Sequence, residues 1–201
     1  MATPPLPAPL PAATVTGAAT RARLLRAAVA IVARDGMPAA TTAALALEAG
    51  VAEGTLYRHF DSKDDLLIAA YRQIKQEVFL NAAAGVDISL PPPERLERAW
   101  KAIYLAYRAD PDAFAFGQRF SESPLAEREG GESARAIGRL VADLRRAGIA
   151  SGDFKNLPVD LLANLFLAPI AYLLKSELKG RRWTDAELDH AAGAVLAGWR
   201  K

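Results

Sequence analysis

A tyrosine, an arginine, a histidine and a lysine lie within nine residues in the stretch Thr55–Lys63, which reads TLYRHFDSK. All four side chains can donate hydrogen bonds to an anion. Ser62 and Asp65 are spaced to cap a helix that begins at Lys63. The amide hydrogens of a helix N-terminus attract anions, and a lysine beside them strengthens such a site. We therefore expect this stretch to bind phosphate groups.

Two short helices must position these side chains. The segment TTAALALEAG predicts a helix that is capped by Thr41 and ends at Gly50, and a second helix is expected from about Glu53 to Phe60. Two helices joined by such a short turn form a helix-turn-helix motif. The second helix of this motif enters the major groove of DNA, where Glu53 could accept from cytosine and Thr55 could contact a thymine methyl group.

Charge is distributed unevenly along the chain. Residues 1–75 contain eight Lys/Arg and six Asp/Glu, whereas residues 76–201 contain seventeen of each. The excess of two positive charges lies in the first part of the chain. This placement agrees with DNA binding there but is too small to establish it.

The rest of the chain predicts an all-α fold of about nine helices, because apolar residues recur with the helical period and no segment favours a strand. A proline-rich arm is expected over residues 1–18, followed by a helix-turn-helix domain over 19–84. GVDISLPPP is expected to be a linker, and residues 91–201 to form a second helical domain. The longest apolar run, Leu161–Leu174, is shorter than a membrane span and contains Asn164 and Pro169. We therefore expect a cytoplasmic protein that does not enter a membrane.

Several classes of chemistry lack the residues they require. The chain has no cysteine, its two histidines are His59 and His190, and no Gly-Lys-Ser/Thr phosphate loop is present. We therefore expect no metal site, no cofactor and no enzymatic activity.

The segment TTAALALEAGVAEGTLYRHFDSKDDLL closely resembles the DNA-binding domain of TetR-family transcriptional regulators, over about Arg21 to Ile74. The resemblance implies base-facing positions at Glu53, Gly54 and Thr55 and phosphate contacts from Tyr57, His59 and Lys63. It also implies contacts with the DNA backbone from Arg21, before the first helix, and from Thr41 and Thr42, at the start of the helix that precedes the recognition helix. The full predicted DNA-binding set is Arg21, Thr41, Thr42, Glu53, Gly54, Thr55, Tyr57, Arg58, His59 and Lys63.

This chain departs from the family pattern at two positions. Ala52 stands where a serine usually caps the recognition helix, and losing a cap costs about 1 kcal/mol. Glu53 stands where a basic or neutral residue is common, and phosphates repel a carboxylate. The acid at position 53 must therefore read a base or point away from the DNA.

The resemblance implies that the second domain dimerises through its last two helices. The sequence supports this independently, because Val159–Leu178 is apolar on nearly all sides. A helix burying this surface inside a monomer is the alternative. A homodimer would bind a palindromic operator on double-stranded DNA. The predicted interface set is Leu161, Leu165, Ala168, Tyr172, Leu188, Ala192, Val195 and Trp199.

Aromatic residues of the second domain are candidates for a ligand pocket. The resemblance favours a repressor that a small hydrophobic or aromatic inducer releases from DNA. A solid core with control by a protein partner, activation instead of repression, and a small helical enzyme remain as alternatives. The predicted pocket set is Trp100, Tyr104, Tyr107, Phe114, Phe116, Phe120 and Phe166.

Overall fold

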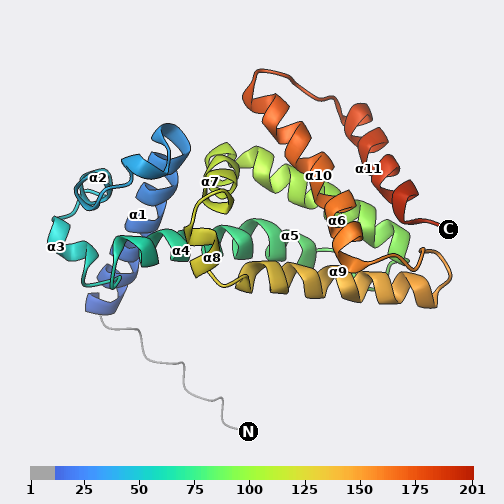
Figure 1. Cartoon of the computed structure of the whole chain (residues 1–201), viewed down its shortest axis with the longest axis horizontal. Helices are drawn as coiled ribbons and strands as arrows, with labels where there is room; N and C mark the ends of the chain where they lie inside the picture. The colour runs from blue at the N-terminus through green and yellow to red at the C-terminus, as the bar shows by residue number, and fades with distance from the viewer. Residues whose placement is uncertain (1–11) are drawn as a thin grey trace, which may run out of the picture. The chain divides into compact units, whose positions relative to one another are not determined.

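The computed structural model describes residues 12–201, and these residues form an all-α fold (Figure 1). The described part contains no strand, and Phe154 and Arg200 form an isolated antiparallel bridge. The expected fold class is therefore confirmed. The elements are α1 (Ala12–Asp35), η1 (Met37–Ala39), α2 (Thr42–Glu48), α3 (Glu53–Leu56), α4 (Lys63–Ile74), η2 (Lys75–Leu80), α5 (Asn81–Ala84), α6 (Pro92–Ala109), α7 (Pro111–Ser121), α8 (Leu125–Arg128), α9 (Glu132–Ala150), α10 (Val159–Leu178) and α11 (Asp185–Trp199).

The first helix and α8 differ from the expected elements. The first helix begins at Ala12, whereas we expected the arm to continue to residue 18. Pro11 is the last proline before Pro38, and the intervening alanines favour a helix. The part of the predicted arm that precedes Ala12 lies outside the described residues. The second difference is α8, a single turn after Pro124 in a segment that we expected to be a loop.

The chain separates into two compact units, one ending at Ala70 and the other running from Tyr71 to Lys201. We expected a boundary after residue 84. The difference arises because α4, the π-helical η2 and α5 form one uninterrupted helix over residues 63–84. The later part of this helix packs against α6 and α9 and so belongs to the second unit.

In the first unit, α1 packs against α2, and α2 packs against α3. The core side chains come from the faces that the apolar spacing predicts. Each of these side chains is less than 10% exposed to solvent. They are Leu24, Ala28, Ile31, Val32, Leu45, Ala46, Leu56, Phe60, Leu66 and Leu67.

In the second unit, α6 lies at the centre and packs against α5, η2, α7, α9, α10 and α11. Trp100 of α6 is fully buried, and its indole nitrogen donates to the Phe166 carbonyl oxygen at 3.0 Å. That carbonyl lies one turn before Pro169, where a proline interrupts the backbone hydrogen bonds of α10. The bond therefore ties α6 to the turn of α10 that precedes this proline.

A buried carboxylate joins the end of α4 to the start of α9. Glu129 is 4% exposed and accepts hydrogen bonds from the Ser133 amide and hydroxyl, each at 3.0 Å. Arg72 lies 3.4 Å from the same carboxylate and 2.9 Å from Glu132. A buried carboxylate is stable only when it is paired and hydrogen-bonded in this way.

Candidate nucleic-acid interface and ligand cavity

The turn between α2 and α3 depends on Gly50, whose φ of +63° lies in the left-handed region. The Gly50 amide donates to Leu47 O at 3.0 Å, and the Val51 amide donates to Ala46 O at 2.9 Å. These bonds end α2 and redirect the chain. Leu45 on one side of the turn and Leu56 on the other are both fully buried, so the turn fixes how α3 is presented.

The α-helical part of α3 is shorter than expected, because it ends at Leu56 and not at Phe60. The chain still turns beyond it, since the amides of His59 and Phe60 both donate to Leu56 O at 3.0 Å. Ala52 precedes α3 with an extended backbone and makes no side-chain cap. The first turn therefore lacks the acceptor that a serine would supply.

The predicted contact residues of α3 and its following turn lie on the outside of the first unit. Tyr57 is 56% exposed, and Glu53, Gly54 and Arg58 are also exposed. Thr55 is half-buried. Among the described residues, the Tyr57 hydroxyl has no hydrogen-bond partner, so it is free to donate to a ligand.

Lys63 begins α4 on a helix end that is properly capped. The Ser62 hydroxyl accepts from the Asp65 amide at 3.1 Å and donates to the Asp65 carboxylate at 2.6 Å. Lys63 is half-exposed, and it forms no ion pair with any described residue. The start of α4 thus combines a capped helix N-terminus with the side chain of Lys63, and His59, which is also half-buried, lies four residues earlier.

The earlier predicted positions also have defined surroundings within the first unit. Thr41 is exposed and caps α2 by accepting from the Ala44 amide at 3.2 Å, and Thr42 is the first residue of that helix. Arg21 is exposed, with its guanidinium 5.0 Å from the centre of the Phe60 ring. This cation–π contact places Arg21 of α1 beside the turn that follows α3.

The predicted aromatic pocket is corrected by the structure, because most of its members fill the core of the second unit. Trp100 stacks on Tyr104 at 6.0 Å between ring centres, and Phe116 stacks on Phe120 at 5.9 Å. Burial raises the pKa of Tyr107 to about 12. The seven rings pack against neighbours instead of surrounding one space. Tyr107 and Phe114 border two other hollows, of about 350 and 110 Å³, and of the seven only Phe166 lines a separate, largely apolar cavity.

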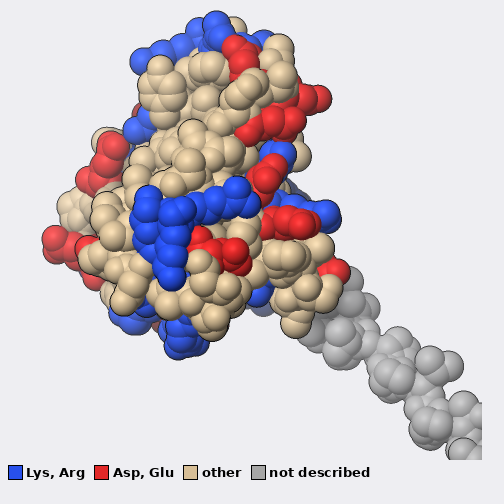
Figure 2. All heavy atoms as spheres, turned by 90° about the vertical axis from the view of Figure 1, so that its right-hand side faces the viewer, with Lys and Arg blue, Asp and Glu red and all other residues tan. Residues whose placement is uncertain are grey.

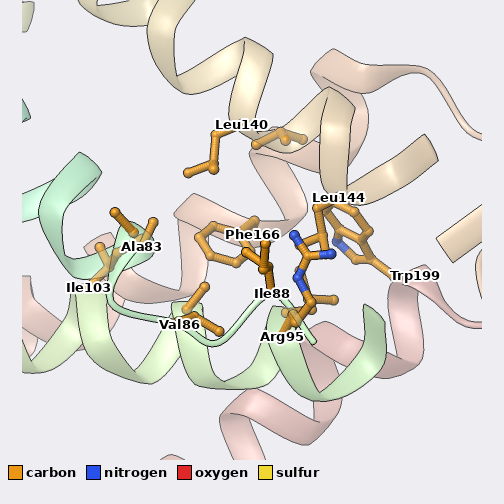
Figure 3. A pocket seen from close by; sticks show the side chains of 13 residues that line it. Ala83, Val86, Ile88, Arg95, Ile103, Leu140, Leu144, Phe166 and Trp199 are labelled. Carbon is orange, nitrogen blue, oxygen red and sulfur yellow. The ribbon is translucent and has the colours of Figure 1, made fainter. Parts of the chain in front are cut away.

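That cavity has a volume of about 130 Å³ and lies within the second unit (Figure 3). Its walls come from α5 and the segment that follows it, from α6, α9 and α10, and from the last residue of α11. The lining residues are Ala83, Ala84, Val86, Ile88, Arg95, Leu96, Ala99, Ile103, Leu140, Val141, Leu144, Phe166 and Trp199. The small side chains of Ala83, Ala84 and Ala99 could have suggested a cavity from the sequence, but they do not indicate which helices face each other.

The predicted dimer interface divides into two groups. The four residues of α10 are exposed, including Leu161 at 44% and Tyr172 at 68%. The four residues of α11, in contrast, are buried within their own protomer. Leu188, Ala192, Val195 and Trp199 retain 6%, 1%, 5% and 0% of their exposure.

This correction follows from the packing of α11. The apolar face of α11 packs against α6 and α10, so its larger side chains are covered. The other face presents small residues. A groove of about 350 Å³ runs between α10 and α11, and its residues are Leu165, Pro169, Tyr172, Leu173, Ala191, Ala194, Val195 and Gly198.

Among the described residues, α10 is the helix that is long and apolar enough to cross a membrane. It has 20 residues, more than the apolar run that we considered from the sequence, and 28% of its apolar window is buried. Core helices of soluble proteins meet the same criterion, so one such helix is weak grounds for a membrane span.

Charges on the second unit are of both signs. On the face that Figure 2 shows, acidic side chains lie beside basic ones across the surface. This agrees with the equal numbers of acidic and basic residues after position 75.

Comparison with known proteins identifies relatives of both units. The sequence model described as "Bacterial regulatory proteins, tetR family" matches residues 24–70, which extend from α1 into α4. The chain is 30% identical to a putative TetR-family transcriptional regulator from Vibrio parahaemolyticus of known structure. That match covers 90% of this chain and 99% of the other, with a TM-score of 0.77.

Two curated relatives are similar over shorter stretches. The repressor KstR2 of Mycobacterium tuberculosis is 29% identical over 153 residues, which are 71% of this chain and 73% of that protein. The uncharacterised regulator TtgW of Pseudomonas putida is 31% identical over 87 residues, which are 43% of this chain and 59% of that protein. The chain thus spans less than two thirds of TtgW.

Proposed function

Because the chain belongs to the TetR family of bacterial regulatory proteins, we propose that it represses transcription from a palindromic operator and is released by a small apolar ligand. It is a helix-turn-helix transcriptional regulator, and regulators of this family are generally non-enzymatic DNA-binding proteins. The relatives include named repressors, which favours repression here. Binding to operator DNA places its action in the cytoplasm.

The outward residues of α3 and the start of α4 carry this proposal. Glu53, Gly54 and Thr55 read base edges in the major groove. Tyr57 and Lys63 bind phosphates, and the absence of a partner for either side chain within the described part of the chain supports that role. Arg21, Thr41, Thr42, Arg58 and His59 contact the DNA backbone around them. Phosphate contacts position the protein, and base contacts supply the specificity.

A homodimer forms through the exposed faces of α10 and α11. Large apolar side chains of α10, Leu161 and Tyr172, are exposed beside a groove lined by small residues of α11, and such a surface favours a second copy of the chain. Two-fold symmetry then presents two copies of α3 to DNA, with half-sites roughly 34–36 Å apart or a multiple of that distance.

Release by ligand uses the continuous helix that runs over residues 63–84. Lys63 heads this helix, and Ala83 and Ala84 at its other end line the apolar cavity. A ligand in the cavity that favours one position of the helix shifts the population between DNA-binding and released forms. The cavity favours this form of control over a solid core that responds to a protein partner.

Selection of bound sites from random duplex DNA tests the operator proposal. We expect palindromic sites, a dimer on a sizing column, and weaker binding by Tyr57→Phe. Ser121→Ala is the control, because it also removes one exposed hydroxyl but lies at the end of α7, outside the proposed DNA-binding and dimer surfaces. Recovery of asymmetric sites, a monomer at micromolar concentration, or equal losses in the two variants would contradict the proposal.

A further inference from the structure

The cavity contains two side chains that can donate hydrogen bonds, Arg95 and Trp199, whereas its other eleven lining residues are aliphatic or phenyl. We propose that its ligand is an amphipathic anion: a monocarboxylate whose apolar tail lies among the aliphatic side chains and whose carboxylate binds Arg95 and Trp199. The inference rests on the proposed ligand-controlled function and names the chemistry of the ligand.

Arg95 differs from the other cations of its helix. On α6, Arg98 lies 3.9 Å from Glu94, Arg108 lies 3.6 Å from Glu177, and Lys101 is paired with Glu97 and Asp189 at 2.7 and 2.8 Å. Arg95 is half-buried and has no such partner among the described residues. Its guanidinium is therefore available to pair with a carboxylate, for which its planar fork of donors is suited.

Trp199 likewise differs from the other tryptophans. The indole nitrogen of Trp100 donates to Phe166 O at 3.0 Å, and that of Trp183 donates to the Ser176 hydroxyl at 2.9 Å. The indole nitrogen of Trp199 is buried, in a residue that is 0% exposed, and it has no hydrogen-bond partner among the residues that the structure describes. A buried donor without an acceptor is unfavourable, so an acceptor supplied by a ligand would stabilise the site.

The two donors lie at the same end of the cavity. In the view of Figure 3, Arg95 and Trp199 lie on one side of Phe166, whereas Ala83 and Ile103 lie on the other. This separation of polar and apolar groups matches a molecule with one charged end and one apolar end. Phe166 and Leu140 lie between these ends and would contact the tail.

Three probes with the same tail test the proposal: decanoate, decanol and decylamine, each titrated into the full-length protein by calorimetry. We expect decanoate to bind about tenfold more tightly than decanol, because a charge-assisted hydrogen bond adds affinity of that order. Decylamine should bind most weakly, since its ammonium would lie beside Arg95. Equal affinities for decanoate and decanol, or no binding of any probe by the folded protein, would overturn the proposal.

Variants then assign the preference to its residues. Arg95→Met keeps an unbranched apolar side chain and should abolish the preference for decanoate while decanol still binds. Arg95→Lys should restore part of it, and Trp199→Phe should reduce it by a smaller factor. Arg98→Met is the control, because Arg98 is an exposed cation on the same helix outside the cavity. A preference that survives Arg95→Met, or that falls equally in Arg98→Met, would refute the assignment.

These measurements do not involve DNA, so the two proposals can fail separately. If decanoate binds through Arg95 but leaves the protein on its operator, the ligand class stands and the release mechanism is wrong. If another ligand releases the DNA and decanoate does not bind, the regulatory proposal stands and the ligand class is wrong.

Discussion

The first unit presents its candidate functional side chains to solvent, whereas the second unit encloses a cavity. In the first unit, Tyr57 and Lys63 lie outside a small apolar core, and neither has a partner among residues 12–201. In the second, Arg95 and Trp199 line an apolar space, and their donors have no partner in the described structure. Unpaired polar groups therefore mark the candidate site in both units, but the partner proposed for the first is a large polyanion and the partner proposed for the second is a small molecule.

The two units also require glycine for different reasons: the second unit for close packing and the first for backbone conformation. The largest effect on stability is expected from a glycine of the second unit. A Cβ at Gly148 of α9 would lie 1.9 Å from the Phe154 ring, which itself packs edge-on against Trp199 at 5.3 Å. We expect Gly148→Ala to lower the free energy of unfolding by about 3 kcal/mol, because the ring cannot stay where it is. Urea denaturation measures this loss.

Gly138→Ala is the matched control on the same helix, because a Cβ there meets nothing within 4 Å. This substitution should stabilise the protein by roughly 0.5–1 kcal/mol, since alanine favours a helix over glycine. Similar effects from the two substitutions would show that close packing of Phe154 is not what requires Gly148.

In the first unit, Gly50 is needed for its backbone conformation and not for space. A Cβ at Gly50 meets nothing within 4 Å, but its φ is +63°. We expect Gly50→Ala to cost about 1–2 kcal/mol of stability. Gly50→Asn should cost less, because asparagine adopts left-handed backbone more readily. If alanine and asparagine are equally destabilising in thermal unfolding, conformational strain is not the cause.

Substitution of Lys63 tests whether this side chain of the first unit contacts the phosphate backbone of DNA. Lys63→Ala should weaken binding to all duplexes by a similar factor and reduce the slope of log affinity against log salt by about 1. Fluorescence anisotropy on operator and unrelated duplexes at several salt concentrations measures both quantities. A loss confined to the operator would instead assign Lys63 to base recognition.

The smallest expected effect is a pH dependence in the stability that a helix cap contributes, and it differs between the two units. Hydrogen bonds from the Thr184 amide and hydroxyl hold the pKa of Glu187 below its ordinary value. A lowered carboxyl pKa stabilises the fold above the ordinary pKa of the group, and this contribution is lost as the pH falls through the folded-state pKa. Thr184→Ala should therefore cost about 1 kcal/mol at neutral pH and less in acid.

Thr41→Ala is the control for that pH dependence. Thr41 caps α2 in the first unit, but Ala44 stands at the position where Glu187 stands in α11. The free energy of unfolding that Thr41→Ala removes should therefore be nearly the same at neutral and acid pH, as measured by urea denaturation. A cost of Thr184→Ala that does not vary with pH would show that Glu187 adds nothing to the cap.

The DNA-binding half could be predicted in detail because its signals are local. The left-handed turn at Gly50, the Ser62 cap and the exposed Tyr57 all depend on neighbours within a few residues. The length of α3 could not be predicted in the same way, because Leu56 and Phe60 are both held in the core while the chain between them turns.

The sequence by itself determined the helical class, the helix-turn-helix and its outward polar residues, because these follow from spacing, caps and turns along a short stretch of chain. Only the tertiary structure decided which apolar face of α11 is covered within the protomer and where the cavity lies. Arg95 and Trp199 are more than a hundred residues apart in the chain, and each lies on an ordinary amphipathic helix. Their shared position results from the packing of α5, α6, α9, α10 and α11 around one space, which no local pattern encodes.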